Sequence, residues 1–152
     1  MNLPVSGNIL ADLIPQKAPF VLISTLEKIE GNQCVTSFLV EENHVMVKDG
    51  KLTEGGLIEN IAQTCAAKAG YECALVGLPI PVGFIGDVRN FSCTQLPIVG
   101  SNISTVIEVE HKVFDATIIS GTIFQDSVAI ATCKMKVFEE DKSKSALAES
   151  EC

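Results

Sequence analysis

Apolar residues recur along the chain with two periodicities, helical in some segments and alternating in others, and each periodicity predicts a type of element. Residues 8–14 are apolar at helical spacing and stop before Pro15, which predicts a short helix. Residues 20–29 and 33–40 are rich in β-branched and apolar side chains, with Gly31 in the polar turn between them. The first forty residues therefore predict a helix followed by a β-hairpin.

Residues 57–76 form the longest run of good helix formers and contain no proline. Gly77 and Pro79 end this run, which predicts one long helix. Lys68 and Glu72 form an i,i+4 pair on one side of it, and the remaining positions are mostly apolar or small. We therefore expect the helix to be buried except along the stripe that contains these two charges.

The second half of the chain predicts an antiparallel sheet. Strand-like runs follow one another at residues 82–92, 102–112, 116–124 and 127–138. Short turns near Asp115 and Asp126 predict that the last three runs form a meander. The fold class is therefore α+β, with an antiparallel sheet wrapped around one long central helix and its edges left for subunit pairing. We expect one domain over residues 1–138 and a disordered acidic tail over residues 139–152.

Composition narrows the classes of function. Hydrophobic residues make up 47% of the chain and charged residues 20%, which is typical of a globular protein. The net charge of -8 argues against binding to nucleic acids or to anionic membranes. The N-terminus has no signal-peptide pattern and no apolar run is long enough to span a bilayer, so we expect a cytoplasmic protein. The six cysteines form no Cys-x-x-Cys pair, so we expect neither a metal site nor a cofactor.

Four short motifs resemble, in the same order, those of one enzyme family. The segment PQKAPFVLI begins at Pro15, GGLIENIAQ at Gly55, GFIGDVRNF at Gly83 and PIVGS at Pro97. They resemble the opening, the central helix, the central strand and the following turn of the β-hydroxyacyl-(acyl carrier protein) dehydratases of fatty-acid synthesis. The loop Gly50-Lys51-Leu52 also resembles that of the dehydratase-like proteins found with aryl-polyene pigment synthesis. The resemblance covers residues 9–137 and implies the hot-dog fold.

The same resemblance implies an active site between two subunits. In the family, a histidine from the loop before the helix works with a carboxylate from the helix of the other subunit. Glu59 matches the carboxylate, whereas Lys51 stands where the family has its histidine. His44 is the histidine nearest to this loop and is our candidate for the missing base. The implied partners are an acyl carrier protein or coenzyme A thioester, and a second copy in a homodimer or larger assembly.

Dehydration of a 3-hydroxyacyl thioester needs one group that removes the α proton and a second that protonates the leaving hydroxyl. Glu59 and His44 are therefore the predicted catalytic residues. Backbone N–H groups at the start of the helix would polarise the thioester carbonyl. Gly55 and Gly56 fit this role, because a residue without Cβ lets a substrate approach the backbone.

Three further residues are candidates for substrate binding. Gln63 follows Glu59 by one helical turn and is placed to hydrogen-bond either that carboxylate or an acyl ligand. Phe84 and Ile85 lie between two glycines on a predicted strand, where glycines often mark a close backbone approach, so they are candidates for the lining of an acyl tunnel.

The sequence leaves three functions open. The first is a dehydratase that acts on 3-hydroxyacyl chains. The second is a catalytically silent subunit that binds acyl chains or pairs with an active partner, which the absent histidine favours. The third is an acyl thioesterase, in which a carboxylate such as Glu59 activates water without a histidine.

Overall fold

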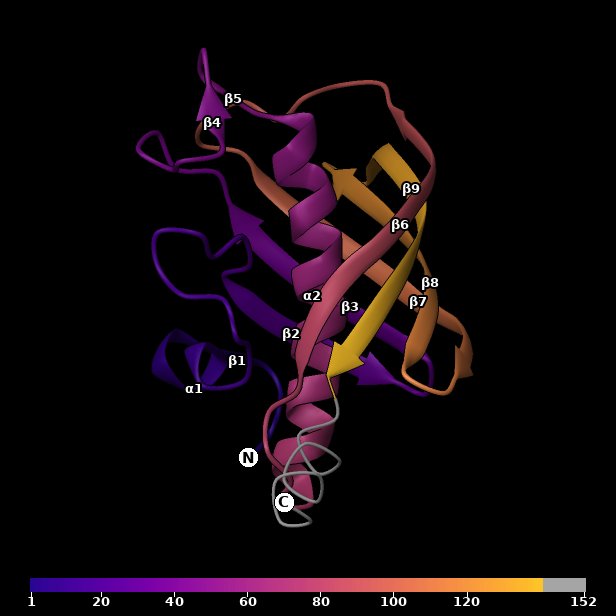
Figure 1. Cartoon of the computed structure of the whole chain (residues 1–152). Helices are drawn as coiled ribbons and strands as arrows, with labels where there is room; N and C mark the ends of the chain where they lie inside the picture. The colour runs from indigo at the N-terminus through magenta and orange to yellow at the C-terminus, as the bar shows by residue number, and fades with distance from the viewer. Residues whose placement is uncertain (141–152) are drawn as a thin grey trace, which may run out of the picture.

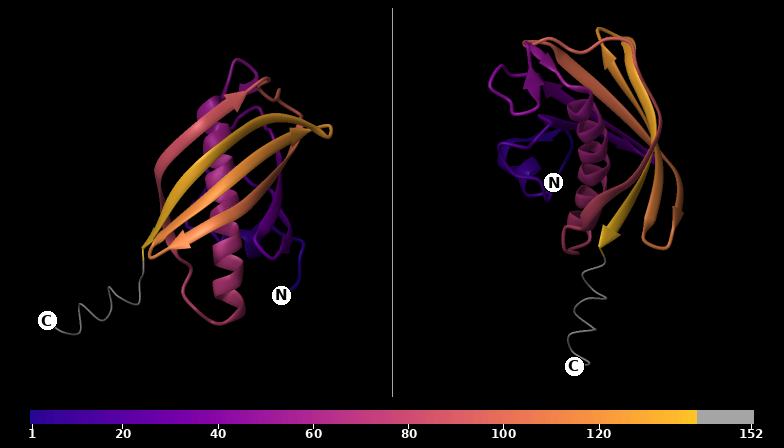
Figure 2. Two further views of the ribbon diagram at one scale, coloured as in Figure 1. Left: turned by 90° about the vertical axis from the view of Figure 1, so that its right-hand side faces the viewer. Right: turned by 45° about the horizontal axis from the view of Figure 1, so that its top comes forward.

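One long helix lies against the concave face of a curved, seven-stranded antiparallel sheet (Figure 1). The computed structural model describes residues 1–140 of the chain. Along the sheet the strand order is β1-β2-β3-β7-β8-β9-β6, and the views in Figure 2 show the sheet curling around helix α2. The α+β class and the wrapped central helix predicted from the sequence are confirmed.

Alternating side chains build the core side of the sheet. The strands are β1 (Val5–Ser6), β2 (Thr25–Glu30), β3 (Gln33–Leu39), β6 (Val82–Cys93), β7 (Asn102–Val113), β8 (Ala116–Gln125) and β9 (Val128–Glu140). Strands β7, β8 and β9 form the predicted meander. Ile119, Ile123 and Met135 point inward and are buried, whereas Lys134 and Lys136 are exposed. This alternation follows from the two-residue period of a strand.

Helix α2 spans Glu54–Leu75 and begins three residues before the predicted start. The Thr53 side chain caps it by accepting a hydrogen bond of 3.1 Å from the Gly56 amide. Close packing holds the helix against the sheet. A Cβ atom added at Gly121 of β8 would lie only 2.6 Å from the Ile61 side chain, so this glycine lets helix and sheet approach each other.

The predicted exposed stripe on α2 is wrong at Lys68, which is only 9% exposed. Its ammonium group bonds the carboxylate of Glu72, whose side chain is half exposed. The long aliphatic stem of a lysine can lie along apolar surface while its charge reaches outward, which explains how Lys68 is accommodated.

Helix α1 is shorter than the predicted helix over residues 8–14 and spans Gly7–Ala11. Leu13 and Ile14 are buried although they follow the helix, so their apolar character reflects packing against the core. The Leu13 carbonyl oxygen lies directly against Gly70 of α2, where an added Cβ would come within 1.8 Å. The chain after α1 is therefore in close contact with the C-terminal half of α2.

Residues 20–24 lie outside β2, so the predicted strand over residues 20–29 is wrong in its first half. The backbone there bonds side chains of α2 in place of a neighbouring strand. The Asn60 side chain donates to the Leu22 carbonyl, and the Leu22 amide donates to the Gln63 side chain, each at 2.7 Å. Apolar residues such as Leu22 and Ile23 are buried there, which gives this loop the composition of a strand.

A small hairpin that the sequence did not predict precedes α2. It consists of β4 (Val47–Lys48) and β5 (Lys51–Leu52). Lys48 and Lys51 are directly opposite each other and are exposed. The fold therefore brings two lysines together beside the N-terminal end of α2.

Strand β9 continues to Glu140, so Glu139 and Glu140, the first two residues of the predicted tail, belong to the sheet. The rest of that tail, residues 141–152, lies outside the described residues. Within residues 1–140, neither helix combines the length and the hydropathy required to cross a lipid bilayer.

Candidate functional site

A groove of about 330 Å³ runs along α2 beside the edge strand β6. Its helical wall begins at Glu59 and continues over small residues to Ala69, a distance of about 15 Å at the usual rise of a helix. The residues that line it are Gln16, Glu59, Ala62, Cys65, Ala66, Ala69, Pro81, Gly83, Phe84, Ile85, Val137 and Glu139. Most are apolar or small, so the groove suits an extended apolar chain with a polar group at the Glu59 end.

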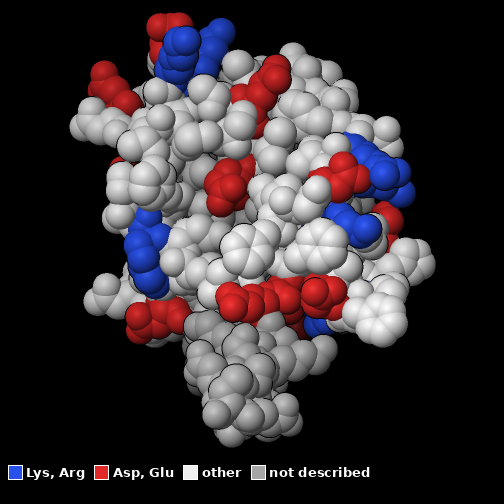
Figure 3. Space-filling model, viewed as in Figure 1, with Lys and Arg blue, Asp and Glu red and all other residues white. Residues whose placement is uncertain are grey.

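The surface around α2 and β6 is largely uncharged (Figure 3). Lysine and arginine side chains lie at its margins, a row of acidic side chains crosses its lower part, and an isolated acidic group lies near the middle. Phe84 and Ile85 of β6 are 57% and 39% exposed. Large exposed apolar side chains next to a groove are typical of a surface that contacts a ligand or another subunit.

Glu59 is half buried, and its carboxylate accepts a hydrogen bond of 3.2 Å from the Gln63 side chain. Gln63 itself is completely buried. Its amide nitrogen also donates to the Phe20 carbonyl at 2.8 Å, and its oxygen accepts from the Leu22 amide. The Gln63 amide is therefore fixed from two sides and holds the Glu59 carboxylate in one orientation.

A buried polar network fixes the helical turn that carries Glu59. Asn60 accepts a hydrogen bond from Thr105 of β7 and donates to Leu22. One turn later, the Thr64 hydroxyl bonds both the Asn60 carbonyl and the hydroxyl of Thr36 on β3. Because these groups join α2 to two strands, the position of Glu59 relative to the sheet is set by several hydrogen bonds.

The two predicted helix N-terminal glycines differ in what they offer a ligand. Gly56 is buried against Leu52, and its amide already donates to Thr53. Gly55 is exposed and lies one turn before Glu59 on the same face of the helix. Neither glycine lines the groove, and Gly55 is the one whose backbone a ligand can approach.

His44 lies in the loop after β3, and both of its ring nitrogens bond the backbone. Nε2 lies 2.7 Å from the Val21 carbonyl, and Nδ1 accepts from the Met46 amide at 3.0 Å. This pattern requires the proton on Nε2, because the carbonyl can only accept. The structure does not bring His44 to the groove with Glu59, and the ring instead joins two loops.

A family model of ApeP dehydratases matches residues 9–148 of the chain. The chain belongs to the ApeP-like dehydratase family. A comparison with curated protein sequences gives no match.

Solved structures support the fold of this ApeP-like protein. The dehydratase heterocomplex ApeI:P from Xenorhabdus doucetiae is similar over 97% of this chain and 98% of that one, with a TM-score of 0.82 and 18% identity. A hypothetical thioesterase from Streptococcus pneumoniae with coenzyme A is similar over 75% and 86% of the two chains, with a TM-score of 0.59 and 13% identity. The E. coli PaaI protein of the phenylacetic acid degradation operon has a TM-score of 0.57 and 13% identity over 74% and 80% of the chains.

The resemblance stated from the sequence motifs is thus confirmed. The protein has the hot-dog fold and is a dehydratase-like protein of acyl thioesters.

The groove of the ApeP-like chain brings together Glu59, Phe84 and Ile85. Gln63 does not line the groove, but its side chain donates a hydrogen bond to Glu59. Sequence reasoning missed Gln16, Pro81 and Glu139 as lining residues. Gln16 lies in the first family-like motif, and its place in that motif was the available signal.

The thiols at the site are not nucleophiles. Burial raises the pKa of Cys65, which lines the groove, to about 12, and does the same for Cys34 across the helix. At neutral pH both remain protonated, and a protonated thiol is a poor nucleophile. The interpretation of these cysteines as core residues is supported.

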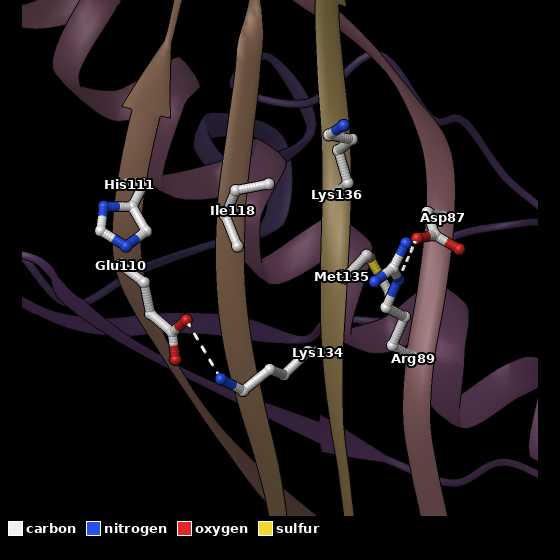
Figure 4. Close-up of a pocket in the computed structure, with 8 residues that line it drawn as sticks. All are labelled: Asp87, Arg89, Glu110, His111, Ile118, Lys134, Met135 and Lys136. Atoms are coloured by element: carbon white, nitrogen blue, oxygen red, sulfur yellow. Dashed lines mark hydrogen bonds and ion pairs between the residues drawn. The ribbon is translucent and has the colours of Figure 1, made fainter.

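A second hollow lies on the outer face of the sheet, away from α2 (Figure 4). Arg89 of β6 and both Lys134 and Lys136 of β9 line it. Arg89 is paired with Asp87 at 2.6 Å, and Lys134 with Glu110 at 3.5 Å. Because these charges are largely paired and exposed, the hollow has the character of a solvated sheet face.

Proposed function

We propose that this chain contributes Glu59 to an acyl-thioester dehydratase whose site is completed by a second hot-dog subunit. The single observation behind this proposal is that the groove holds a positioned carboxylate without an imidazole of the same chain. The sequence contains two histidines. His44 is bonded to backbone at both nitrogens, and His111 lies on the outer face of the sheet.

The chemistry explains why a second subunit is needed. Dehydration breaks the bond between Cα and hydrogen and the bond between Cβ and oxygen, forms the double bond and releases water. In this proposal Glu59 donates the proton to the departing hydroxyl, and an imidazole of the partner subunit accepts the α proton. A homodimer brings in another His44 with the same two backbone bonds, so a histidine-bearing subunit of a different sequence fits better. The similarity to a dehydratase heterocomplex supports this assignment.

The substitution E59Q tests the proposal. The complex is prepared by co-expressing the chain with a histidine-bearing hot-dog subunit of the same organism, and its activity is followed as water loss from a 3-hydroxyacyl thioester. E59Q retains the shape of the side chain and removes its transferable proton, so the rate is expected to fall about 10²-fold or more while binding persists. E54Q, an exposed acid in the first turn of the same helix, is the matched control and should leave the rate unchanged. Full activity of the E59Q complex would indicate a silent subunit.

A thioesterase is the second candidate, because the groove contains a carboxylate that could activate water with only an amide beside it. The chain on its own distinguishes the two. Release of free thiol from an acyl thioester by the isolated chain, abolished by E59Q, would favour hydrolysis. Activity that appears only with the second subunit favours dehydration.

The carrier of the acyl group is proposed to dock at the hairpin lysines. Lys48 and Lys51 face each other across β4 and β5, an arrangement that is unfavourable for two like charges without a counter-ion. The hairpin directly precedes α2 in the chain, and Glu59 lies near the N-terminal end of that helix. The phosphate ester of coenzyme A, or of the arm of an acyl carrier protein, has the complementary charge.

Charge reversal separates this surface from the other cluster of basic residues. The double substitution K48E/K51E is expected to weaken binding of coenzyme A thioesters about tenfold or more at low salt, and less at high salt. K134E/K136E, on the outer face of the sheet, is the matched control and should have no effect. A loss confined to the control would move the docking surface to the outer face.

A further inference from the structure

Gln16 is a polar residue of the groove whose side-chain oxygen lacks a hydrogen-bond partner within residues 1–140. Its Oε1 atom is buried and has no hydrogen-bond partner among the described residues. Buried amide oxygens are nearly always paired in native proteins, so an unpaired one calls for an explanation. Gln16 lines the same groove as Glu59, in a wall of mostly apolar side chains.

The segment that carries Gln16 is fixed at several points. The ammonium group of Lys17 donates to the carbonyls of Ala11 and Ile14, at 2.6 and 3.1 Å. Before Gln16, the Leu13 carbonyl lies against Gly70 of α2. After it, the Phe20 carbonyl accepts from Gln63. The unpaired oxygen therefore belongs to a well-anchored part of the fold.

These anchors also give the place of Gln16 along the groove. The segment contacts α2 first at Gly70 and then at Gln63, so Gln16 lies alongside the part of the helix that contains Ala66. Ala66 is seven residues after Glu59, which corresponds to about 10 Å along the helix axis. A chain whose thioester lies at Glu59 would pass Gln16 with its distal carbons.

We infer that the Gln16 amide is a specificity-determining contact, which hydrogen-bonds a polar group carried by the distal part of the bound acyl chain. The inference rests on the proposed function, because it takes the reacting end of the chain to lie at Glu59. The Oε1 atom has no surface open to the groove, so the Gln16 side chain has to rotate to present it. A hydroxyl on the ligand then pairs with this oxygen, whereas a plain alkyl chain leaves it unpaired. A site built to hydrogen-bond a substrate group discriminates strongly against the analogue that lacks it.

The test is a binding experiment that does not depend on turnover. Coenzyme A thioesters of saturated chains of increasing length, each with and without a terminal hydroxyl, are titrated into the full chain in its native assembly. At the chain length that reaches Gln16, the wild type is expected to bind the hydroxylated chain about tenfold more tightly than the alkyl chain. Q16L should remove or reverse this preference without weakening the binding of the alkyl chain.

Gln125 provides a matched control, because its Oε1 is also buried without a partner in the described part of the chain but does not line the groove. Q125L should retain the wild-type preference. A wild type without preference at any length, or a Q16L variant that keeps the preference, would overturn this inference alone. If no thioester of either series binds, the proposed groove is wrong and the inference fails with it.

Discussion

Two amide side chains of α2 take the place of a β-strand partner for the loop at residues 20–22. Asn60 and Gln63 are both completely buried, and together they bond the backbone of Phe20 and Leu22. Gln63 uses the same amide nitrogen to hold Glu59. A residue that looks like a substrate contact in the sequence is therefore also a structural anchor, and its replacement affects stability as well as the site.

The substitution Q63L is expected to lower the free energy of unfolding by about 2 to 4 kcal/mol. It leaves the buried Leu22 amide and the part-buried Phe20 carbonyl without their partner, and a fully buried unpaired backbone group costs about 1 to 3 kcal/mol. Urea denaturation measures the change. E59Q, which keeps an acceptor opposite Gln63, is the control and should cost less than about 1 kcal/mol. Equal losses in the two variants would contradict the anchoring role.

The buried thiols give the protein an alkaline limit of stability. Burial raises the pKa of Cys34 and Cys65 from 9.0 to about 12, and that of Cys133 to about 11. Between pH 9.0 and the folded-state pKa of each thiol, the folded chain keeps a proton that the unfolded chain releases. The resulting stability is therefore complete below pH 9 and is lost as the pH rises toward the folded-state pKa values.

The free energy of unfolding is expected to fall by roughly 1 kcal/mol per buried thiol between pH 8 and pH 10. Urea titrations across this range measure the slope. C34A should be less stable at neutral pH because a buried group is removed, yet its stability should decline less steeply above pH 9. A slope unchanged by this substitution would assign the alkaline loss to other groups.

At the scale of elements, the position of α2 is set by two glycines at which neighbouring segments come into close contact with it. Gly70 contacts the carbonyl of Leu13, and the Ile61 side chain packs against Gly121 of β8. Small residues at these points bring the N-terminal segment and the sheet up to the helix. Ala62, Ala66 and Ala69, on the face toward β6, leave space there that forms the groove.

The substitutions G70A and G55A should have opposite effects on stability. A Cβ at Gly70 collides with backbone, so G70A is expected to cost about 2 to 3 kcal/mol. A Cβ at Gly55 meets the flexible end of Met46 at 3.3 Å and the Thr53 hydroxyl at 4.0 Å, so G55A should gain up to about 0.5 to 1 kcal/mol from helix propensity. Thermal unfolding measures both. A destabilised G55A would show that the start of α2 is packed more tightly than it looks.

The elements that could be predicted from the sequence are those in which the spacing of apolar residues matches the buried face of the element. The meander and the long helix have clear periodicity, and their bounds were correct to within a few residues. The prediction for residues 20–24 was wrong because buried loop residues have the composition of a strand when distant side chains bond their backbone. The hairpin β4–β5 was missed because strands of two residues carry no periodic signal.

At the site, Glu59 was predicted to be catalytic, and Phe84 and Ile85 of β6 were predicted to line an acyl tunnel. The structure brings all three to one groove. Whether they bind or catalyse stays a prediction. Gln16 could not be predicted because its place in the groove depends on how the N-terminal segment folds back onto Gly70. The two bonds of His44 depend likewise on the backbone geometry of two loops.

At the scale of the whole molecule, β6 is an exposed edge strand of the sheet and also forms one wall of the groove. Within residues 1–140 it pairs with β9 on one side, and its other side has no strand partner. Unpaired edges that carry large apolar side chains tend to pair with another chain. A subunit that covers this edge would also close the groove over Glu59, which would exclude water from the acyl chain.

The substitution I85K should therefore prevent assembly without unfolding the protomer. Ile85 is already 39% exposed, so a lysine there can reach water, and its charge opposes burial in an interface. Light scattering after size exclusion is expected to give a mass well above the 16.2 kDa protomer for the wild type, either alone or mixed with the histidine-bearing subunit, and the protomer mass for I85K. V128K, at an exposed position on β9 away from β6, is the matched control and should assemble normally. A wild type that stays a protomer in both settings would leave the groove open to solvent and would remove the basis for a site shared between subunits.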